Sequence, residues 1–195
     1  MSEDWRLFIA LELPPDVLKA IGRVQNDLKS ALGSRSLRWT RPEGIHLTLK
    51  FLGDVPTGQI DAIKAGMAQA ASAGRPFELR ALGLGCFPNL DRPRVLWAGL
   101  TGEIEPLRAL QAAVEQQIAP LGFPAEARGF SPHLTLARTA QSAGRAEISA
   151  IGQAAASRAR VEIAAWRVST LSLMRSQLKP DGAAYTRVAG VELGT

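Results

Sequence analysis

The sequence "IHLTLKFLG" (residues 45–53) contains the tetrapeptide HLTL, which occurs again at the start of "HLTLAR" (residues 133–138). The chain has 195 residues and two histidines, and each histidine, His46 and His133, begins one copy of the tetrapeptide. Both stretches alternate polar and apolar residues with a period of two, which predicts β-strands. Two copies of one strand, each opened by a histidine, indicate an internal repeat.

The elements around the two tetrapeptides follow the same order. His133 follows His46 by 87 residues, and Ala164 follows Phe77 by the same distance, and the two residues of each pair belong to corresponding strands. Alternating and helical periodicities predict these elements in both halves. In the first half they are a strand 5–13, a helix 15–32, a strand 45–53, a helix 57–74 and a strand 77–85. In the second half they are a strand 94–100, a helix 102–122, a strand 133–138, a helix 145–159, a long strand 161–175 and a final strand 183–193.

This order predicts an α+β fold in which residues 1–195 form a single domain of two similar lobes. We expect duplication with pseudo-twofold symmetry, with approximate repeats 5–90 and 91–180. Each lobe would hold an antiparallel sheet that faces a central cleft, with the helices on the outside. Strands can be exchanged between the two lobes in such an arrangement.

Composition places the chain among globular proteins. Apolar residues make up 46% and charged residues 21% of the sequence, which is ordinary for a globular domain. No run approaches the roughly 18 apolar residues of a membrane span, and the acidic start does not resemble a secretory signal. A single cysteine, Cys86, allows no internal disulfide and no metal site by itself. We therefore expect a cytoplasmic protein, monomeric by default, that does not bind membranes. The net charge of +5 favours an anionic partner only weakly, because it also serves solubility.

Each tetrapeptide presents an imidazole and a hydroxyl on one face. Successive side chains of a strand point to opposite faces, so His46 shares a face with Thr48, and His133 with Thr135. Taken singly, each residue would usually have a structural role. Because both histidines occur in the same context in matching halves, we expect them to form one site.

Three kinds of chemistry are open to two imidazoles and two hydroxyls. A metal site would need more ligands than two histidines, and a threonine nucleophile would need a base and an oxyanion site that the sequence does not indicate. Paired general acid and base catalysis fits best, because one neutral and one protonated imidazole can coexist near neutral pH. The hydroxyls can then hydrogen-bond the phosphate oxygens during in-line displacement at phosphorus.

The two H-x-T-x motifs and their surroundings resemble the 2H phosphoesterase superfamily, in particular the RNA 2′,3′-cyclic phosphodiesterases, also called 2′-5′ RNA ligases. Nearly the whole chain carries the resemblance, in the stretches "RLFIALELP", "RWTRPEGIHLTLKFLGDV", "GCFPN", "PRVLWAGL", "FSPHLTLAR" and "LSLMRSQLKPDGAAYTRV". The resemblance implies metal-independent hydrolysis of RNA 2′,3′-cyclic phosphate ends, or of small cyclic nucleotides, to 2′-phosphomonoesters, without a cofactor. It implies that His133 accepts a proton from water and His46 donates one to the 3′ oxygen. Thr48 and Thr135 would bind the phosphate.

Three flanking residues are weaker candidates for substrate binding. Lys50 shares the parity of His46, which would place it on the same face unless it is a solvated residue at the strand end. Arg138 has the wrong parity for the face of His133, although the related family often has an arginine there and a bulge could redirect it. Phe8 lies on the face of its strand away from the leucines and could stack on a base, although packing against a helix is the simpler interpretation.

Two alternative functions remain open from the sequence. The same four residues could join a cyclic-phosphate end to a 5′-hydroxyl end as a 2′-5′ RNA ligase. The chain could also be a non-catalytic RNA-binding module, against which the intact histidines and threonines of both motifs argue.

Overall fold

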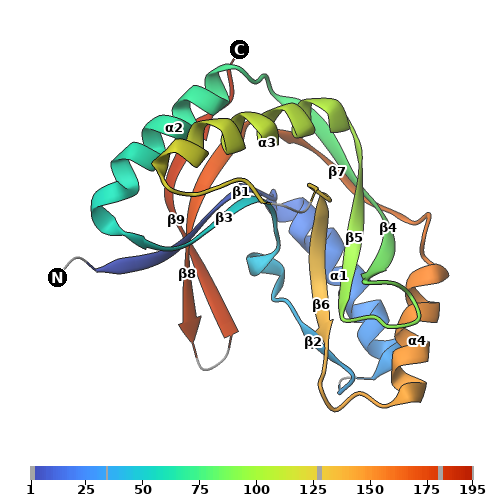
Figure 1. The fold of residues 1–195 in the computed structure, drawn as a ribbon. Helices are drawn as coiled ribbons and strands as arrows, with labels where there is room; N and C mark the ends of the chain where they lie inside the picture. Colours follow the sequence, from blue (N-terminus) through green and yellow to red (C-terminus); the bar gives the residue numbers. More distant parts are fainter. Residues whose placement is uncertain (1–2, 34, 127–128, 180–181, 195) are drawn as a thin grey trace.

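The computed structural model describes residues 3–33, 35–126, 129–179 and 182–194. Within these residues the strands form two antiparallel sheets, one of four and one of five strands, and helices pack against both (Figure 1). The predicted α+β class with two antiparallel sheets is confirmed. None of the described helices has the length and apolar character that crossing a bilayer requires.

The four-stranded sheet combines strands from the two ends of the chain. Its order is β3–β1–β8–β9, with every neighbouring pair antiparallel. These strands are β1 (Asp4–Glu12), β3 (His46–Pro56), β8 (Thr170–Lys179) and β9 (Gly182–Glu192). The first HLTL strand, β3, is therefore at one edge of its sheet.

The five-stranded sheet also takes strands from both halves. Its order is β2–β6–β5–β4–β7, again antiparallel throughout. These strands are β2 (Leu37–Trp39), β4 (Phe77–Phe87), β5 (Val95–Gly102), β6 (His133–Thr139) and β7 (Glu162–Val168). The second HLTL strand, β6, is next to the edge strand of its sheet, which is the short strand β2. Strand β2 was not predicted, because three residues are too few to show a clear alternation.

Each sheet is contacted by helices from both halves of the chain, just as each sheet contains strands from both halves. Helix α3 (Ile104–Ile118) contacts β3, and α2 (Ile60–Ser72) contacts β8 and β9, while α1 (Pro15–Leu32) contacts β7 and α4 (Arg145–Ala156) contacts β4. Short 3-10 helices precede or follow several elements; they are η1 (Pro42–Gly44), η2 (Thr57–Gln59) and η3 (Ala119–Leu121). Helix α1 thus contacts the sheet to which the preceding strand β1 does not belong, and α3, which follows β5, contacts β3 of the four-stranded sheet as well as β4 of the five-stranded sheet.

Helix α1 shows how the local sequence sets these elements. Pro15 occupies the first helical position, where its fixed φ is suitable and no amide hydrogen is needed. Gly33 ends the helix with a φ of 75°, which a residue without a Cβ adopts at little cost. Between these ends Val17, Ile21 and Leu28 recur at helical spacing and are buried. They fix which face of α1 packs into the core.

The long strand expected over residues 161–175 is two strands in different sheets. Strand β7 ends at Val168 in the five-stranded sheet, and β8 begins at Thr170 in the four-stranded sheet. Buried residues fall on even positions up to Val168 and include the odd positions Leu171 and Leu173 afterwards. This change of phase in the apolar alternation marks the crossover, and it is visible in the sequence.

Candidate active site

The two histidines occupy equivalent positions at the start of β3 and β6, and these two strands contact each other, with Cα atoms within 8 Å. His46 Nδ1 lies 2.8 Å from the carbonyl oxygen of Gly44, and His133 Nδ1 lies 2.8 Å from that of Ser131. A carbonyl only accepts hydrogen bonds, so Nδ1 of each ring carries the hydrogen. In the neutral form the lone pair is then on Nε2, which leaves Nε2 of both rings as the nitrogen that exchanges protons.

The threonines lie on the same faces as the histidines. In β3 the half-buried His46 and Thr48 alternate with leucines that are buried, and in β6 His133 and Thr135 do the same. The leucines belong to the hydrophobic core, so core packing determines which face carries the imidazole and the hydroxyl. Each motif thus brings one proton-transfer group and one hydrogen-bond donor to a half-exposed surface.

Aromatic rings surround His46 more closely than His133. Phe8 stacks on His46 with centroids 4.5 Å apart, and Tyr185 of β9 meets the imidazole edge-on at 5.0 Å. Among the residues that the structure describes, His133 has one such contact, edge-on with Phe87 at 4.9 Å. Burial among these rings lowers the pKa of His46, and the hydrogen bond to Gly44 and the charge of a nearby glutamate offset this only in part.

That glutamate, Glu12, is held in place on the strand next to His46. The two residues are direct cross-strand partners in β1 and β3. The hydroxyl of Ser172 donates a hydrogen bond of 2.7 Å to Glu12 Oε2, and Arg187 Nε donates to the same oxygen. A fixed negative charge therefore faces His46. Sequence reasoning missed it because it depends on the pairing of β1 with β3 and on contacts that join Glu12 to residues more than 150 positions away.

Strand β3 contains a bulge one residue beyond Thr48. Thr48 and Lys50 pair with consecutive residues of β1, so Leu49 is an extra residue without a partner. A bulge of this kind interrupts the alternation and exchanges the faces of the residues that follow. Leu49 and Lys50 are accordingly both buried, and Phe51 is 63% exposed.

The prediction that Lys50 shares the face of His46 is wrong, because the bulge turns Lys50 toward helix α3. Lys50 is 1% exposed. Its ammonium forms an ion pair with Glu115 and donates a hydrogen bond of 2.9 Å to the carbonyl of Pro124. Lys50 therefore joins the first motif strand to the segment that leads into the second motif, and it is not positioned to contact a substrate on the face of His46.

Phe8 lies on the expected face but does not offer an open ring. It is 3% exposed, and one face of its ring is covered by His46. Its cross-strand partner Phe51, with ring centroids 6.2 Å apart, is the exposed aromatic residue on this surface. The sequence signal for Phe51 is the spacing of three between Leu49 and Leu52, where strict alternation would give two.

Strand β6 contains a bulge at the corresponding place. Thr135 and Ala137 pair with consecutive residues of β5, so Leu136 is the extra residue. Leu136 and Ala137 are both buried, and Arg138 is exposed. The bulge considered above for Arg138 is therefore present, and it places Arg138 on the face of His133 and Thr135.

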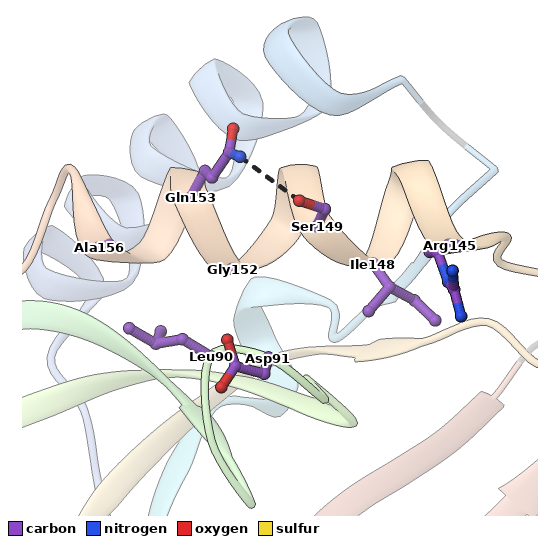
Figure 2. Close-up of a pocket in the computed structure, with 8 residues that line it drawn as sticks. All are labelled: Leu90, Asp91, Arg145, Ile148, Ser149, Gly152, Gln153 and Ala156. Carbon is purple, nitrogen blue, oxygen red and sulfur yellow. Dashed lines mark hydrogen bonds between the residues drawn. The ribbon is translucent and has the colours of Figure 1, made fainter.

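Two cavities of the structure are lined by residues other than the two histidines. A cavity of about 330 Å³ lies between α4 and the segment after β4, and Figure 2 shows its lining residues, which include Leu90, Asp91, Arg145 and Ser149. A smaller cavity of about 170 Å³ lies beside α3 and is lined by Leu49 and Glu115, among others. Neither cavity is lined by His46 or His133. Among the described residues, no three or more His, Cys, Asp or Glu side chains are grouped so that they could hold a metal ion.

The sequence is similar to one known protein family along most of its length. The LigT like Phosphoesterase family matches residues 11–97 and, separately, residues 99–185. The same family therefore matches twice, and each match contains one HLTL strand.

Several curated relatives carry the same description. A protein of Methanothermobacter thermautotrophicus described as RNA 2′,3′-cyclic phosphodiesterase is 35% identical over 182 residues, which cover 93% of this chain and 95% of the relative. A protein of Aquifex aeolicus with the same description is 30% identical and covers 90% and 93% of the two chains. A third, from Thermus thermophilus, is 32% identical and covers 93% and 86%.

Solved structures share the fold. A crystal structure of a Thermus thermophilus protein superposes with a TM-score of 0.78 at 31% identity, covering 96% of this chain and 97% of that one. The crystal structure of E. coli LigT complexed with 3′-AMP gives a TM-score of 0.77 at 23% identity and covers 99% and 100%. The second comparison concerns the fold alone.

Proposed function

Because the chain belongs to the LigT-like phosphoesterase family, we propose that it hydrolyses the 2′,3′-cyclic phosphate at the 3′ end of RNA to a 2′-phosphomonoester. The observation that carries this proposal is the matched pair of histidines on two contacting strands, each with Nδ1 bound to a backbone carbonyl and a threonine beside it. The name of the relatives, RNA 2′,3′-cyclic phosphodiesterase, supports the same reaction.

In the proposed reaction the phosphorus atom lies between the two motifs. His133 Nε2 accepts a proton from water, whose oxygen forms a new bond to phosphorus. The bond from phosphorus to the 3′ oxygen breaks, and the protonated His46 donates its Nε2 proton to that oxygen. Thr48 and Thr135 donate hydrogen bonds to the non-bridging oxygens, where negative charge accumulates. The assignment of donor and acceptor follows the family resemblance, because the two motifs are alike.

The surroundings of His46 suit a proton donor that acts on an anion. Burial lowers its pKa, which makes the protonated ring a stronger acid but leaves less of it protonated at neutral pH. A bound phosphate brings a negative charge next to the ring and raises its pKa again. Protonation of His46 is then coupled to the arrival of the substrate. Glu12 acts in the same direction from the neighbouring strand.

The test is a hydrolysis assay on a short RNA that ends in a 2′,3′-cyclic phosphate, in buffer that contains EDTA. We expect turnover, a 2′-phosphomonoester as the product, and no requirement for an added metal ion or cofactor. A 3′-phosphomonoester would contradict the proposed scission of the bond to the 3′ oxygen. Loss of activity in EDTA that zinc or magnesium restores would contradict metal-independent catalysis.

We further propose that the enzyme is a cytoplasmic monomer. The buried Cys86 is a free thiol, which suits a reducing compartment. Sedimentation velocity tests the oligomeric state, and a stable dimer at micromolar concentration would contradict it.

A further inference from the structure

Two arginines lie opposite each other at the edge of the five-stranded sheet. Arg38 of β2 and Arg138 of β6 are direct partners in the antiparallel register, so their side chains leave the same face about 5 Å apart at Cβ. Both are exposed, and within the described residues neither forms an ion pair. Like charges in this arrangement repel each other, and a bound anion would relieve the repulsion.

The arginine pair adjoins the second catalytic motif. Because Leu136 is bulged, Arg138 is the next residue after Thr135 on the same face of β6. The strand rise places their Cα atoms roughly 7–10 Å apart, so an anion bound by the pair would lie beside the phosphate at Thr135 without coinciding with it. Strand β2 is the edge of its sheet (Figure 1), so a chain bound there can continue into solvent.

We propose that Arg38 and Arg138 bind the internucleotide phosphate on the 5′ side of the nucleotide that carries the cyclic phosphate. Guanidinium groups match phosphate oxygens with paired hydrogen bonds, which makes arginine well suited to this contact. The inference rests on the proposed function and narrows it: the preferred substrate is an oligonucleotide, because a nucleoside 2′,3′-cyclic phosphate lacks the phosphate that the pair would bind.

The test compares two substrates, a dinucleotide that ends in a 2′,3′-cyclic phosphate and adenosine 2′,3′-cyclic phosphate. The measured quantity is the ratio of kcat/KM for the dinucleotide to kcat/KM for the nucleoside. Arg38→Gln should lower this ratio about tenfold, the usual scale for one charge-assisted contact to an anion. Arg23→Gln is the matched control: it removes the same charge from an exposed position on α1, and its ratio should equal that of the wild type.

The outcomes separate this inference from the proposed function. A selective fall of the ratio in Arg38→Gln supports the subsite. If kcat/KM of the wild type is the same for both substrates, or if Arg38→Gln lowers it equally for both, the phosphate subsite is refuted, while the proposed hydrolysis stands. If the wild type hydrolyses neither substrate, the proposed function fails. In that case the subsite is tested by binding of a dinucleotide 3′-phosphate and of adenosine 3′-phosphate. The subsite is supported only if Arg38→Gln weakens the affinity for the dinucleotide more than the affinity for adenosine 3′-phosphate.

Discussion

The ion pair between Lys50 and Glu115 gives a quantitative test of how the first motif strand is held. We predict that Glu115→Gln destabilises the protein by about 3 kcal/mol, because it leaves a buried ammonium without its counterion. Lys50 is 1% exposed, and its remaining hydrogen-bond acceptor would be the carbonyl of Pro124. The expected value is at the lower end of the range of about 3–5 kcal/mol for such a change, because the glutamine can still accept a hydrogen bond.

The assay is urea unfolding followed by circular dichroism, with thermal melting as a second measure. A loss of about 3 kcal/mol corresponds to a fall in Tm of roughly 6–12 °C for a chain of this size. The double variant Lys50→Met/Glu115→Leu removes both charges, and we expect it to be within about 1.5 kcal/mol of the wild type, as apolar replacements of buried pairs often are.

The exposed pair between Lys64 and Asp61 serves as the control. Its side chains are largely exposed, so Lys64→Met should change the free energy of unfolding by about 0.5 kcal/mol or less. If Glu115→Gln also costs less than about 1 kcal/mol, Lys50 has access to water or to another acceptor. That result would refute the claim that buried Lys50 joins β3 to α3 and to Pro124 through its ion pair and its hydrogen bond.

Two further predictions concern the surroundings of the motifs. If His46 is the proton donor, kcat/KM falls as the pH rises through the pKa of His46. Glu12→Gln should shift this fall to lower pH, because it removes a negative charge that raises the pKa of His46. A pH profile of kcat/KM that does not move, or that moves to higher pH, counts against this role of Glu12. Gln25 is fully buried, and its amide donates to the carbonyls of Thr40 and of the bulged Leu136. Gln25→Leu removes these hydrogen bonds and should destabilise the protein by about 1–3 kcal/mol in urea unfolding. Ser30→Ala on the exposed side of α1 is the control, and an equal effect of the two variants would contradict the view that Gln25 supports the bulge at Leu136.

Local periodicity was sufficient to predict most of the elements and the two motif strands. The alternation in residues 133–138 determines a strand whose leucines enter the core, and this alternation places the histidine and threonine on the other face. The bulges and the crossover after Val168 also leave a local signal, the change of apolar phase. This change of phase explains why Phe51 and Arg138 are exposed and why Lys50 is buried. Strict alternation predicts the opposite face of the strand for each of the three residues.

The pairing of strands could not be predicted from the sequence in the same way. Glu12 meets His46 because β1 pairs with β3, whereas Tyr185 reaches His46 from β9, which is three positions from β3 in the sheet order and contacts the short helix η1 just before His46. These contacts depend on non-local hydrogen bonding between distant segments, and local residue patterns do not encode it. The boundaries of the two repeats, 5–90 and 91–180, stay a prediction.

The most direct test of paired catalysis is the turnover rate of His46→Ala, His133→Ala and the double variant on an RNA with a 2′,3′-cyclic phosphate end. Each single variant should be slower by about 10²–10⁴, the usual contribution of a positioned proton-transfer group. The double variant should lose little more, because the two residues act as a unit. A folded single variant with a rate close to that of the wild type would contradict the claim that both imidazoles act on one phosphorus atom.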